Sequence, residues 1–240
     1  MKAAAAKLAL PLFTYIALGV VSFIIALILT PIIRYIALKL NITDKPDFSR
    51  KLHTTPHALL GGLAIYIAFI STIAYAYFHI PEFSKLFPTK NYNGLLIGSF
   101  LIILIGLFDD IYNLTAIFKL FFQFIPAVIL YYYDFKIDLL TNPFTGETMN
   151  LSEPISFTLT ILWVIGLTNA INLIDGMDGL ASGITIIGCA TLFLIALNRG
   201  SEDIVSAILT IILLGACSGF IKYNFPPASI FMGDTGSLFI

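Results

Sequence analysis

Two adjacent aspartates, Asp109 and Asp110, end a long apolar run in the segment GLFDD. Two neighbouring carboxylates repel each other, and each is costly to remove from water. A divalent cation relieves both costs, because Mg2+ is typically held by one or two carboxylates together with substrate phosphates. The pair therefore predicts metal or phosphate chemistry. The alternative is a cap on the following helix, for which one aspartate is enough.

A second polar group lies in the segment NAINLIDGMDGLASG, where an amide or carboxylate side chain recurs at every third residue. Its members are Asn169, Asn172, Asp175 and Asp178. On a continuous helix this spacing makes one slowly drifting polar stripe, and the glycines among them let the backbone turn or a ligand approach closely. A hydrophilic turn between helices is the alternative, but it does not explain the asparagines. We expect a binding site.

A third acid, Asp234, lies in the segment YNFPPASIFMGDTGSLF. The two prolines hold the chain extended before a short apolar run, so Asp234 is predicted at the start of a helix. A carboxylate there interacts favourably with the helix dipole, which is the structural alternative to a role in chemistry. Phe231 in the same segment could stack on a base or pack in the core.

Basic side chains accompany these acids. The segment DKPDFSRKLHTTPHALLGG holds Arg50, Lys51 and His53, which could clamp a phosphate or set the topology of the chain in a membrane. Lys119 lies inside the apolar segment after the aspartate pair, where its side chain could reach a phosphate or extend to the water interface. The residues alone leave both pairs of alternatives open.

The composition of the chain shows which kind of structure must position these residues. The 240-residue chain is 58% hydrophobic and 11% charged, with a mean hydropathy of +0.95. Soluble domains average about 25% charged residues, so this chain cannot cover itself with a surface that faces water. Its net charge of -1 offers no basic field and argues against nucleic acid as a partner. Cys189 and Cys217 lie in apolar runs and are expected to be buried as small hydrophobic residues.

Apolar segments long enough to cross a bilayer follow one another along the chain. We place spans at 9–33, 58–78, 94–108, 116–133, 156–172, 180–197 and 204–222, with the start of an eighth at about Gly236. The predicted fold is all-α: a polytopic transmembrane helical bundle with about seven complete spans, in a single domain over 1–240. Turn residues between short alternating runs add a short extracytoplasmic hairpin at 134–155.

The loops between these spans sort the acids. Alternate loops, at 34–57, 109–115, 173–179 and 223–235, hold every acidic residue singled out above and so share one face of the membrane. The other loops hold scattered, ordinary polar residues. Lys and Arg number seven on the first face and six on the second, so the positive-inside rule does not decide the orientation.

Taken together and in order, four segments resemble the polyprenyl-phosphate N-acetylhexosamine-1-phosphate transferase superfamily, glycosyltransferase family 4. They are DKPDFSRKLH followed by GG, GLFDD followed by KLFFQ, NAINLIDGMDGLASG, and NFPPASIFMGDTGS. The first and third forms are more similar to the WecA/TagO branch than to the MraY branch. The resemblance covers nearly the whole chain.

The resemblance implies transfer of N-acetylglucosamine-1-phosphate, or a related N-acetylhexosamine-1-phosphate, from a UDP-sugar to undecaprenyl phosphate. It implies catalytic roles for Asp109, Asp110 and Asp178, and Mg2+ ligation by Asp109, Asp110 and Asp234, with Mn2+ as an alternative cation. It implies substrate binding by Lys51, Lys119, Asn172, Asp175, Asn224 and Phe231, with Asn224 and Phe231 at the uracil ring. It places the site on the cytoplasmic face of the plasma membrane and allows a homodimer.

The expected reaction is attack of a lipid phosphate oxygen on the β-phosphorus of the donor, with release of UMP. Direct attack is favoured over an aspartyl-phosphate intermediate, because the attacking phosphate is already largely ionised. Members of the superfamily continue beyond GDTGS with further spans and a His-rich loop, so we expect this chain to be a fragment of a longer protein.

Two other functions share part of this pattern. A transporter with acids at its cytoplasmic gate is the alternative, although transporters usually hold such acids near the bilayer midplane. A CDP-alcohol phosphatidyltransferase is rejected, because its signature needs an Arg after Ala181 and two further acids, and Ser182 stands there instead.

Overall fold

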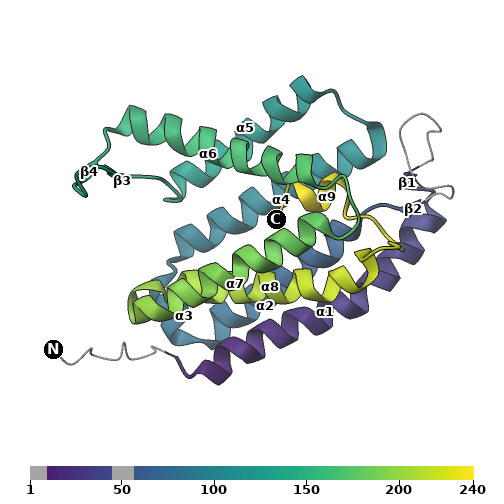
Figure 1. Ribbon diagram of the computed structural model, residues 1–240, viewed down its shortest axis with the longest axis horizontal. Helices are drawn as coiled ribbons and strands as arrows, with labels where there is room; N and C mark the ends of the chain where they lie inside the picture. Colours follow the sequence, from purple (N-terminus) through teal and green to yellow (C-terminus); the bar gives the residue numbers. More distant parts are fainter. Residues whose placement is uncertain (1–9, 45–56) are drawn as a thin grey trace.

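The computed structural model describes residues 10–44 and 57–240, and almost all of its regular structure is helical (Figure 1). The helices are α1 (Leu12–Lys39), α2 (Gly61–His79), α3 (Pro81–Leu86), α4 (Thr89–Tyr112), α5 (Ala116–Tyr132), α6 (Glu153–Ile174), α7 (Leu180–Arg199), the 3-10 helix η1 (Gly200–Asp203), α8 (Ile204–Asn224) and α9 (Gly233–Ser237). The strands form two antiparallel pairs, β1 (Thr43–Asp44) with β2 (His57–Ala58) and β3 (Leu139–Thr141) with β4 (Thr148–Asn150).

The predicted all-α membrane bundle is confirmed. Within the described residues, six helices are long and apolar enough to cross a membrane: α1, α2, α4, α6, α7 and α8. The apolar helix α5 has 17 residues, close to the lower limit for a span. Each of the seven predicted spans therefore corresponds to a helix. The predicted hairpin is also present, as β3 and β4.

Several predicted boundaries were wrong. The span at 94–108 belongs to a helix of 24 residues that runs from Thr89 to Tyr112, so Asp109 and Asp110 lie in its last turn and not in a loop. This helix ends where Asn113 adopts a φ of 51°, a left-handed conformation that asparagine tolerates. Similarly, α1 continues through Pro31 to Lys39, and α9 begins at Gly233 rather than near Gly236.

Helix α8 packs against α1, α2 and α7. Glycines permit the closest approach, because a Cβ at Gly215 of α8 would lie 2.1 Å from the backbone oxygen of Gly19 in α1. Small residues at such contacts are typical of helix packing in membranes. Helices α5 and α6 contact each other and form a separate layer on the other side of α4 and α9 (Figure 1).

The short helix α9 is enclosed by α2 and α4. A Cβ at Gly62 in α2 would lie 2.1 Å from the Cα of Gly236, and one at Gly106 in α4 would lie 2.5 Å from the carbonyl oxygen of Asp234. The segment before α9 is fixed as well, since Ile230 forms a parallel bridge with Ala58 of β2. Neither the β1–β2 pair nor this bridge was predicted. The bridge helps to hold α9 between spans that are distant in sequence.

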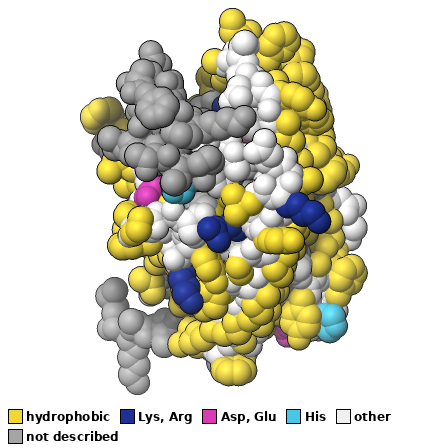
Figure 2. Space-filling model, turned by 90° about the vertical axis from the view of Figure 1, so that its right-hand side faces the viewer, with side chains coloured by type: hydrophobic (Ala, Val, Ile, Leu, Met, Phe, Trp, Pro, Cys, Tyr) yellow, Lys and Arg dark blue, Asp and Glu magenta, His cyan; other side chains and the backbone are white. Residues whose placement is uncertain are grey.

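The predicted sorting of loops onto two faces agrees with the structure. Figure 1 shows β1, β2 and α9 toward one end of the bundle, and α3 with the β3–β4 hairpin toward the other. Figure 2 looks at the first end, where Lys and Arg side chains lie among polar and backbone atoms and hydrophobic side chains cover the flanks. The acids predicted to share a face are therefore carried by the same end of the molecule.

Candidate active site

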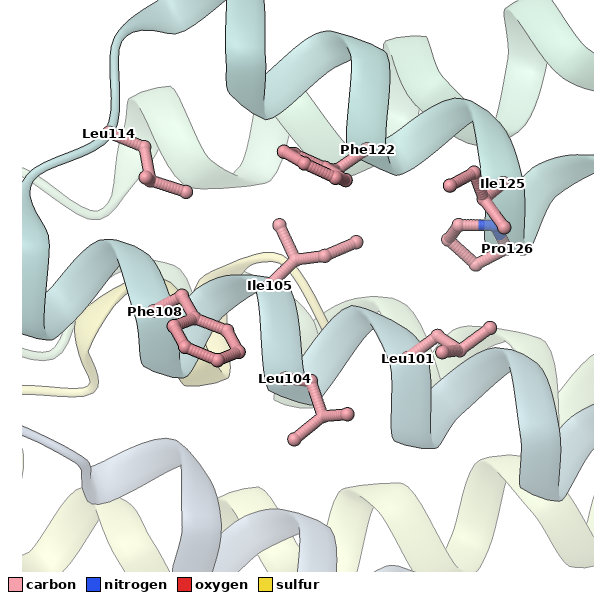
Figure 3. Close-up of a pocket in the computed structure, with 8 residues that line it drawn as sticks. All are labelled: Leu101, Leu104, Ile105, Phe108, Leu114, Phe122, Ile125 and Pro126. Atoms are coloured by element: carbon pink, nitrogen blue, oxygen red, sulfur yellow. The ribbon is translucent and has the colours of Figure 1, made fainter.

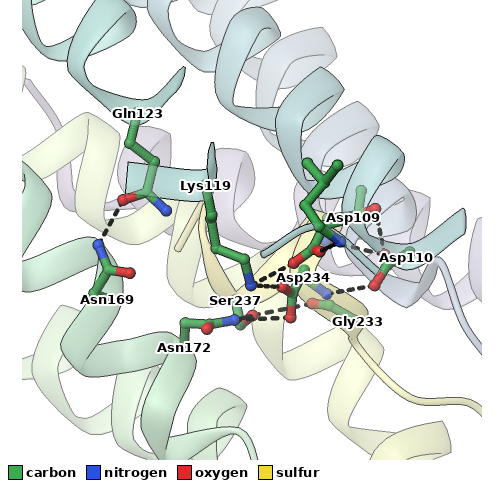
Figure 4. Close-up of polar contacts among 11 residues, drawn as sticks. Asp109, Asp110, Lys119, Gln123, Asn169, Asn172, Gly233, Asp234 and Ser237 are labelled. Atoms are coloured by element: carbon green, nitrogen blue, oxygen red, sulfur yellow. Dashed lines mark hydrogen bonds and ion pairs between the residues drawn. The ribbon is translucent and has the colours of Figure 1, made fainter. Parts of the chain in front are cut away.

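Three charged side chains from three helices meet at this end of the bundle (Figure 4). The ammonium group of Lys119 in α5 forms ion pairs with Oδ2 of Asp109 in α4 and with Oδ2 of Asp234 in α9. The side chains are mostly buried, with exposed fractions of 16% for Lys119, 8% for Asp109 and 27% for Asp234. One ammonium group thus lies between two carboxylates and reduces the repulsion between them. We call these three residues the charged cluster.

A tight connection between α4 and α5 brings two of these residues together. Only 113–115 separate the helices, and the N–H of Leu114 donates a 2.6 Å hydrogen bond to Oδ1 of Asp109. Lys119 lies in the first turns of α5, next to the last turn of α4. In this structure the Lys119 side chain points to Asp109 and Asp234 and does not extend to the water interface.

Asp110 has a different set of partners from its neighbour. Its Oδ1 accepts a 2.7 Å hydrogen bond from the N–H of Asp234, and its Oδ2 accepts bonds from the N–H and the hydroxyl of Thr235, at 3.0 and 2.6 Å. A Cβ at Gly233, whose φ is 70°, would lie 2.5 Å from Oδ2 of Asp110. Asp110 therefore binds the first turn of α9 from α4. The capping alternative accounts for these hydrogen bonds, with α9 as the capped helix and not α5, and the catalytic and metal-binding roles of Asp110 stay predictions.

Asn172 in α6 completes the setting of the charged cluster. Its Nδ2 donates to Oδ1 of Asp234 at 2.9 Å and to Oγ of Ser237 at 2.7 Å. Burial raises the pKa of the Asp234 carboxyl, but the hydrogen-bonding neighbours, Asp109 first and then Lys119, outweigh burial and lower its pKa. Asp234 is therefore ionised at neutral pH, with one oxygen on Lys119 and the other on Asn172.

The two acids of the α6–α7 turn lie beside this arrangement. Burial, followed by the negative charge of Asp234, raises the pKa of Asp175 to about 7. Asp178 accepts a 2.9 Å hydrogen bond from the N–H of Ala228, and so ties the turn to the segment before α9. Among the described residues no hydrogen bond joins Asp178 to the charged cluster, and its catalytic role stays a prediction.

The residues predicted at the uracil ring have internal contacts. Asn224 is 2% exposed; its Oδ1 accepts from the N–H of Gly179 and the hydroxyl of Ser182, and its Nδ2 donates to the carbonyl of Ile230. The ring of Phe231 stacks on His57 with centroids 4.8 Å apart. Their roles at a base stay predictions. Lys51, a further predicted contact, lies outside the described residues.

Sequence reasoning gave no role to Gln123, although the residue stands in the quoted segment KLFFQ. Its Oε1 accepts a 2.5 Å hydrogen bond from Nδ2 of Asn169, which joins α5 to α6 one turn from Lys119 (Figure 4). The available signal was spacing. Lys119 and Gln123 are four residues apart in an otherwise apolar helix and must share a face.

An apolar pocket of about 360 Å³ lies between α4 and α5 (Figure 3). It is lined by Leu101, Leu104, Ile105, Phe108, Leu114, Phe122, Ile125 and Pro126. Phe108 directly precedes Asp109, and Leu114 donates its N–H to Asp109, so one end of the pocket adjoins the charged cluster. The pocket therefore offers an uncharged surface next to the charged groups.

The donor set fits a divalent cation of the Mg2+ type only with help from a ligand. In residues 10–44 and 57–240 no group of three or more His, Cys, Asp or Glu side chains could by itself hold a metal ion. Asp109 and Asp234 nevertheless converge on one positive group, the ammonium of Lys119. Two carboxylates together with substrate phosphates are a common way to bind Mg2+.

Comparisons with known proteins place this site in a family. The sequence model of glycosyl transferase family 4 matches residues 92–240, more than half of the chain. The chain belongs to glycosyl transferase family 4. The matched region contains the whole charged cluster, together with Asp110, Gln123 and Asn172.

Three relatives illustrate what this family member is similar to. It is 39% identical to the probable undecaprenyl-phosphate N-acetylglucosaminyl 1-phosphate transferase of Bacillus subtilis (strain 168), over 92% of the chain and 58% of that protein. It is 31% identical to the decaprenyl-phosphate N-acetylglucosaminephosphotransferase of Mycobacterium leprae (strain TN), over 96% of the chain and 59% of that protein. It is 33% identical to the phospho-N-acetylmuramoyl-pentapeptide-transferase of Bacillus subtilis (strain 168), over 95% of the chain and 71% of that protein. The chain thus spans less than two thirds of the first two relatives.

Proposed function

We propose that this protein transfers N-acetylglucosamine-1-phosphate, or a related N-acetylhexosamine-1-phosphate, from a UDP-sugar to undecaprenyl phosphate and releases UMP. The reaction would be the first membrane step of a cell-envelope polysaccharide pathway. The observation that carries the proposal is the charged cluster, in which Lys119 forms ion pairs with both Asp109 and Asp234 at the end of the spans. The names of the relatives support the same sugar and the same class of lipid.

The chemistry requires positive charge at this place. Attack of a lipid phosphate on a nucleotide diphosphate brings several anionic oxygens together, so cations must reduce their repulsion. Mg2+, with Mn2+ as the alternative, would be held by Asp109 and Asp234 and would neutralise charge on the phosphates. Lys119 supplies a further positive charge that the protein itself provides.

The two adjacent aspartates would divide the work. Asp109 is the better candidate for removing the last proton from the lipid phosphate, because it belongs to the charged cluster. Both oxygens of Asp110 accept hydrogen bonds from the first turn of α9, so Asp110 would position Asp234. With Asp109 as the base and Asp110 as a positioning residue, direct attack by the lipid phosphate remains the proposed route. In this route the base needs to accept only one proton.

The surroundings of the charged cluster suit a lipid acceptor. The apolar pocket between α4 and α5 would receive part of the isoprenoid chain while the phosphate remains at the charged end (Figure 3). The acids lie at the ends of helices, whereas a transporter usually holds them in broken helices near the midplane, so the transporter alternative is less well supported. UDP-sugars are cytosolic, and we therefore assign this end of the molecule to the cytoplasmic face of the plasma membrane.

The test is UMP release by the complete protein in detergent, with UDP-N-acetylglucosamine, undecaprenyl phosphate and Mg2+. We expect release only when both substrates are present, and its loss in Asp234→Asn. Asp138→Asn is the matched control, because Asp138 pairs with Lys136 beside the hairpin at the opposite end. Absence of UMP release by the folded wild-type protein, across a panel of UDP-sugars, would refute the proposal.

A further inference from the structure

Gln123 carries a buried hydrogen-bond donor that the protein does not use. The side chain is 2% exposed, and its Nε2 has no hydrogen-bond partner in the described part of the chain. Its Oε1, in contrast, accepts the hydrogen bond from Asn169. An unsatisfied buried N–H group is expensive, and such groups are rare unless a ligand or water completes them.

The direction of this donor is fixed by its neighbour. Nδ2 of Asn169 also donates to the carbonyl oxygen of Ile165, at 2.8 Å, so the Asn169 amide cannot turn over without losing that bond. Nδ2 of Asn169 is therefore the donor to Gln123, and Oε1 of Gln123 must be the acceptor. The nitrogen of Gln123 is left on the side of Lys119, as Figure 4 shows.

A ligand that met Lys119 could also meet Gln123. The two residues are four positions apart on α5, so their side chains lie on one face, with Gln123 about 6 Å farther from the start of the helix. A water-soluble nucleotide sugar approaches from the start of α5, while a lipid phosphate approaches along the membrane. The deeper donor thus suits the lipid substrate.

We propose that Gln123 binds a phosphate oxygen of the polyprenyl-phosphate acceptor, next to Lys119, and so positions the acceptor for attack. A neutral amide can donate this hydrogen bond without the cost of burying a second charge beside Lys119. The inference rests on the lipid acceptor named in the proposed function. It adds a binding residue for that acceptor. It also predicts that loss of Gln123 leaves the binding of the UDP-sugar unchanged.

The test compares Gln123→Met with the wild-type complete protein. Methionine keeps much of the shape and removes the donor. It also removes Oε1, so Asn169 keeps only its bond to Ile165. We expect the KM for undecaprenyl phosphate to rise about tenfold, as for the loss of one hydrogen bond to a charged group, with the KM for the UDP-sugar unchanged. The melting temperature should fall only by what the lost Asn169 hydrogen bond contributes, about 1 kcal/mol of stability. Ser22→Ala in α1 is the matched control, since Oγ of Ser22 is likewise buried without a partner.

Lipid binding measured without any UDP-sugar separates this inference from the proposed function. The readout is the rise in melting temperature with undecaprenyl phosphate, against undecaprenol, which lacks the phosphate. We expect Gln123→Met to reduce the rise and Ser22→Ala to keep it, even if no UMP is released. An unchanged response to the lipid phosphate in Gln123→Met would overturn the inference. So would a lower melting temperature with an unchanged KM, because that result would assign Gln123 to structure alone.

Discussion

At the scale of single residues, the adjacent aspartates show how a shared residue type can hide different roles. Asp109 forms an ion pair with Lys119, whereas Asp110 accepts hydrogen bonds from the backbone of α9. The sequence predicted that the pair serves a charged site, because two carboxylates beside an apolar span are costly. It could not predict the division, since the partners of Asp110 lie more than 120 residues farther along the chain.

The change Asp110→Asn tests this division. Asparagine has one acceptor oxygen, so its amide nitrogen would face a donor of α9, and we expect the protein to lose about 1–3 kcal/mol of stability. The melting temperature should fall by roughly 2–10 °C. Asp109→Asn should lower it by a similar amount, because Oδ1 of asparagine can still accept from Leu114 but its amide nitrogen would face the ammonium of Lys119. Equal melting temperatures for wild type and Asp110→Asn would contradict the role of Asp110.

Lys119 should also govern how stability responds to Mg2+. In Lys119→Met, Asp109 and Asp234 face each other without a cation, so the protein should be destabilised when metal is removed with a chelator. Mg2+ added together with the UDP-sugar should restore the melting temperature and raise it more than in wild type, because the metal no longer competes with an ammonium group. A smaller Mg2+ response in the variant would show that these two carboxylates do not hold the cation.

Asp175 should make stability depend on pH. Its pKa of about 7 in the folded protein exceeds the ordinary value of 3.8, so the folded state keeps a proton that the unfolded state loses between these values. Stability should therefore fall as pH rises through this window, with the loss complete above pH 7. Asp175→Asn should weaken that fall, as melting curves from pH 5 to pH 8 can show. Identical pH profiles would refute the assignment.

At the scale of elements, the spans could be predicted and the contacts between them could not. Apolar length alone located the six long apolar helices and the shorter α5 in the described part of the chain, since a bilayer sets that length. The ends of these helices were predicted less well, because polar residues such as Asp109 can continue a helix when residues of other elements form hydrogen bonds or ion pairs with them. The bridge between β2 and Ile230 and the enclosure of α9 depend on contacts between distant segments, which no local pattern encodes.

The enclosure of α9 gives a prediction of its own. In Gly62→Ala the new methyl group would lie 2.1 Å from the Cα of Gly236, so α9 must shift at a cost of about 1–3 kcal/mol or more. Because α9 carries Asp234, UMP release should fall together with the melting temperature. Gly166→Ala in α6, where nothing lies within 4 Å, should change neither. Normal activity in Gly62→Ala would show that the site tolerates movement of α9.

At the scale of the whole molecule, the bundle gathers its acids at one end and leaves apolar flanks for the membrane. Loop counting predicted this arrangement, because successive spans must return the chain to alternate faces. The assignment of this end to the cytoplasm follows from the proposed substrate and not from charge, since Lys and Arg are almost evenly divided. A homodimer stays a prediction, as does the single-domain organisation.

The most direct test of the central claim is UMP release by Lys119→Met at a Mg2+ concentration that restores its melting temperature. The account predicts a loss of about 100-fold or more, because the charged cluster then lacks the positive charge that the phosphates require. Lys136→Met, which removes an ion pair at the opposite end, should keep the wild-type rate. A folded Lys119→Met protein that releases UMP at the wild-type rate would contradict the account.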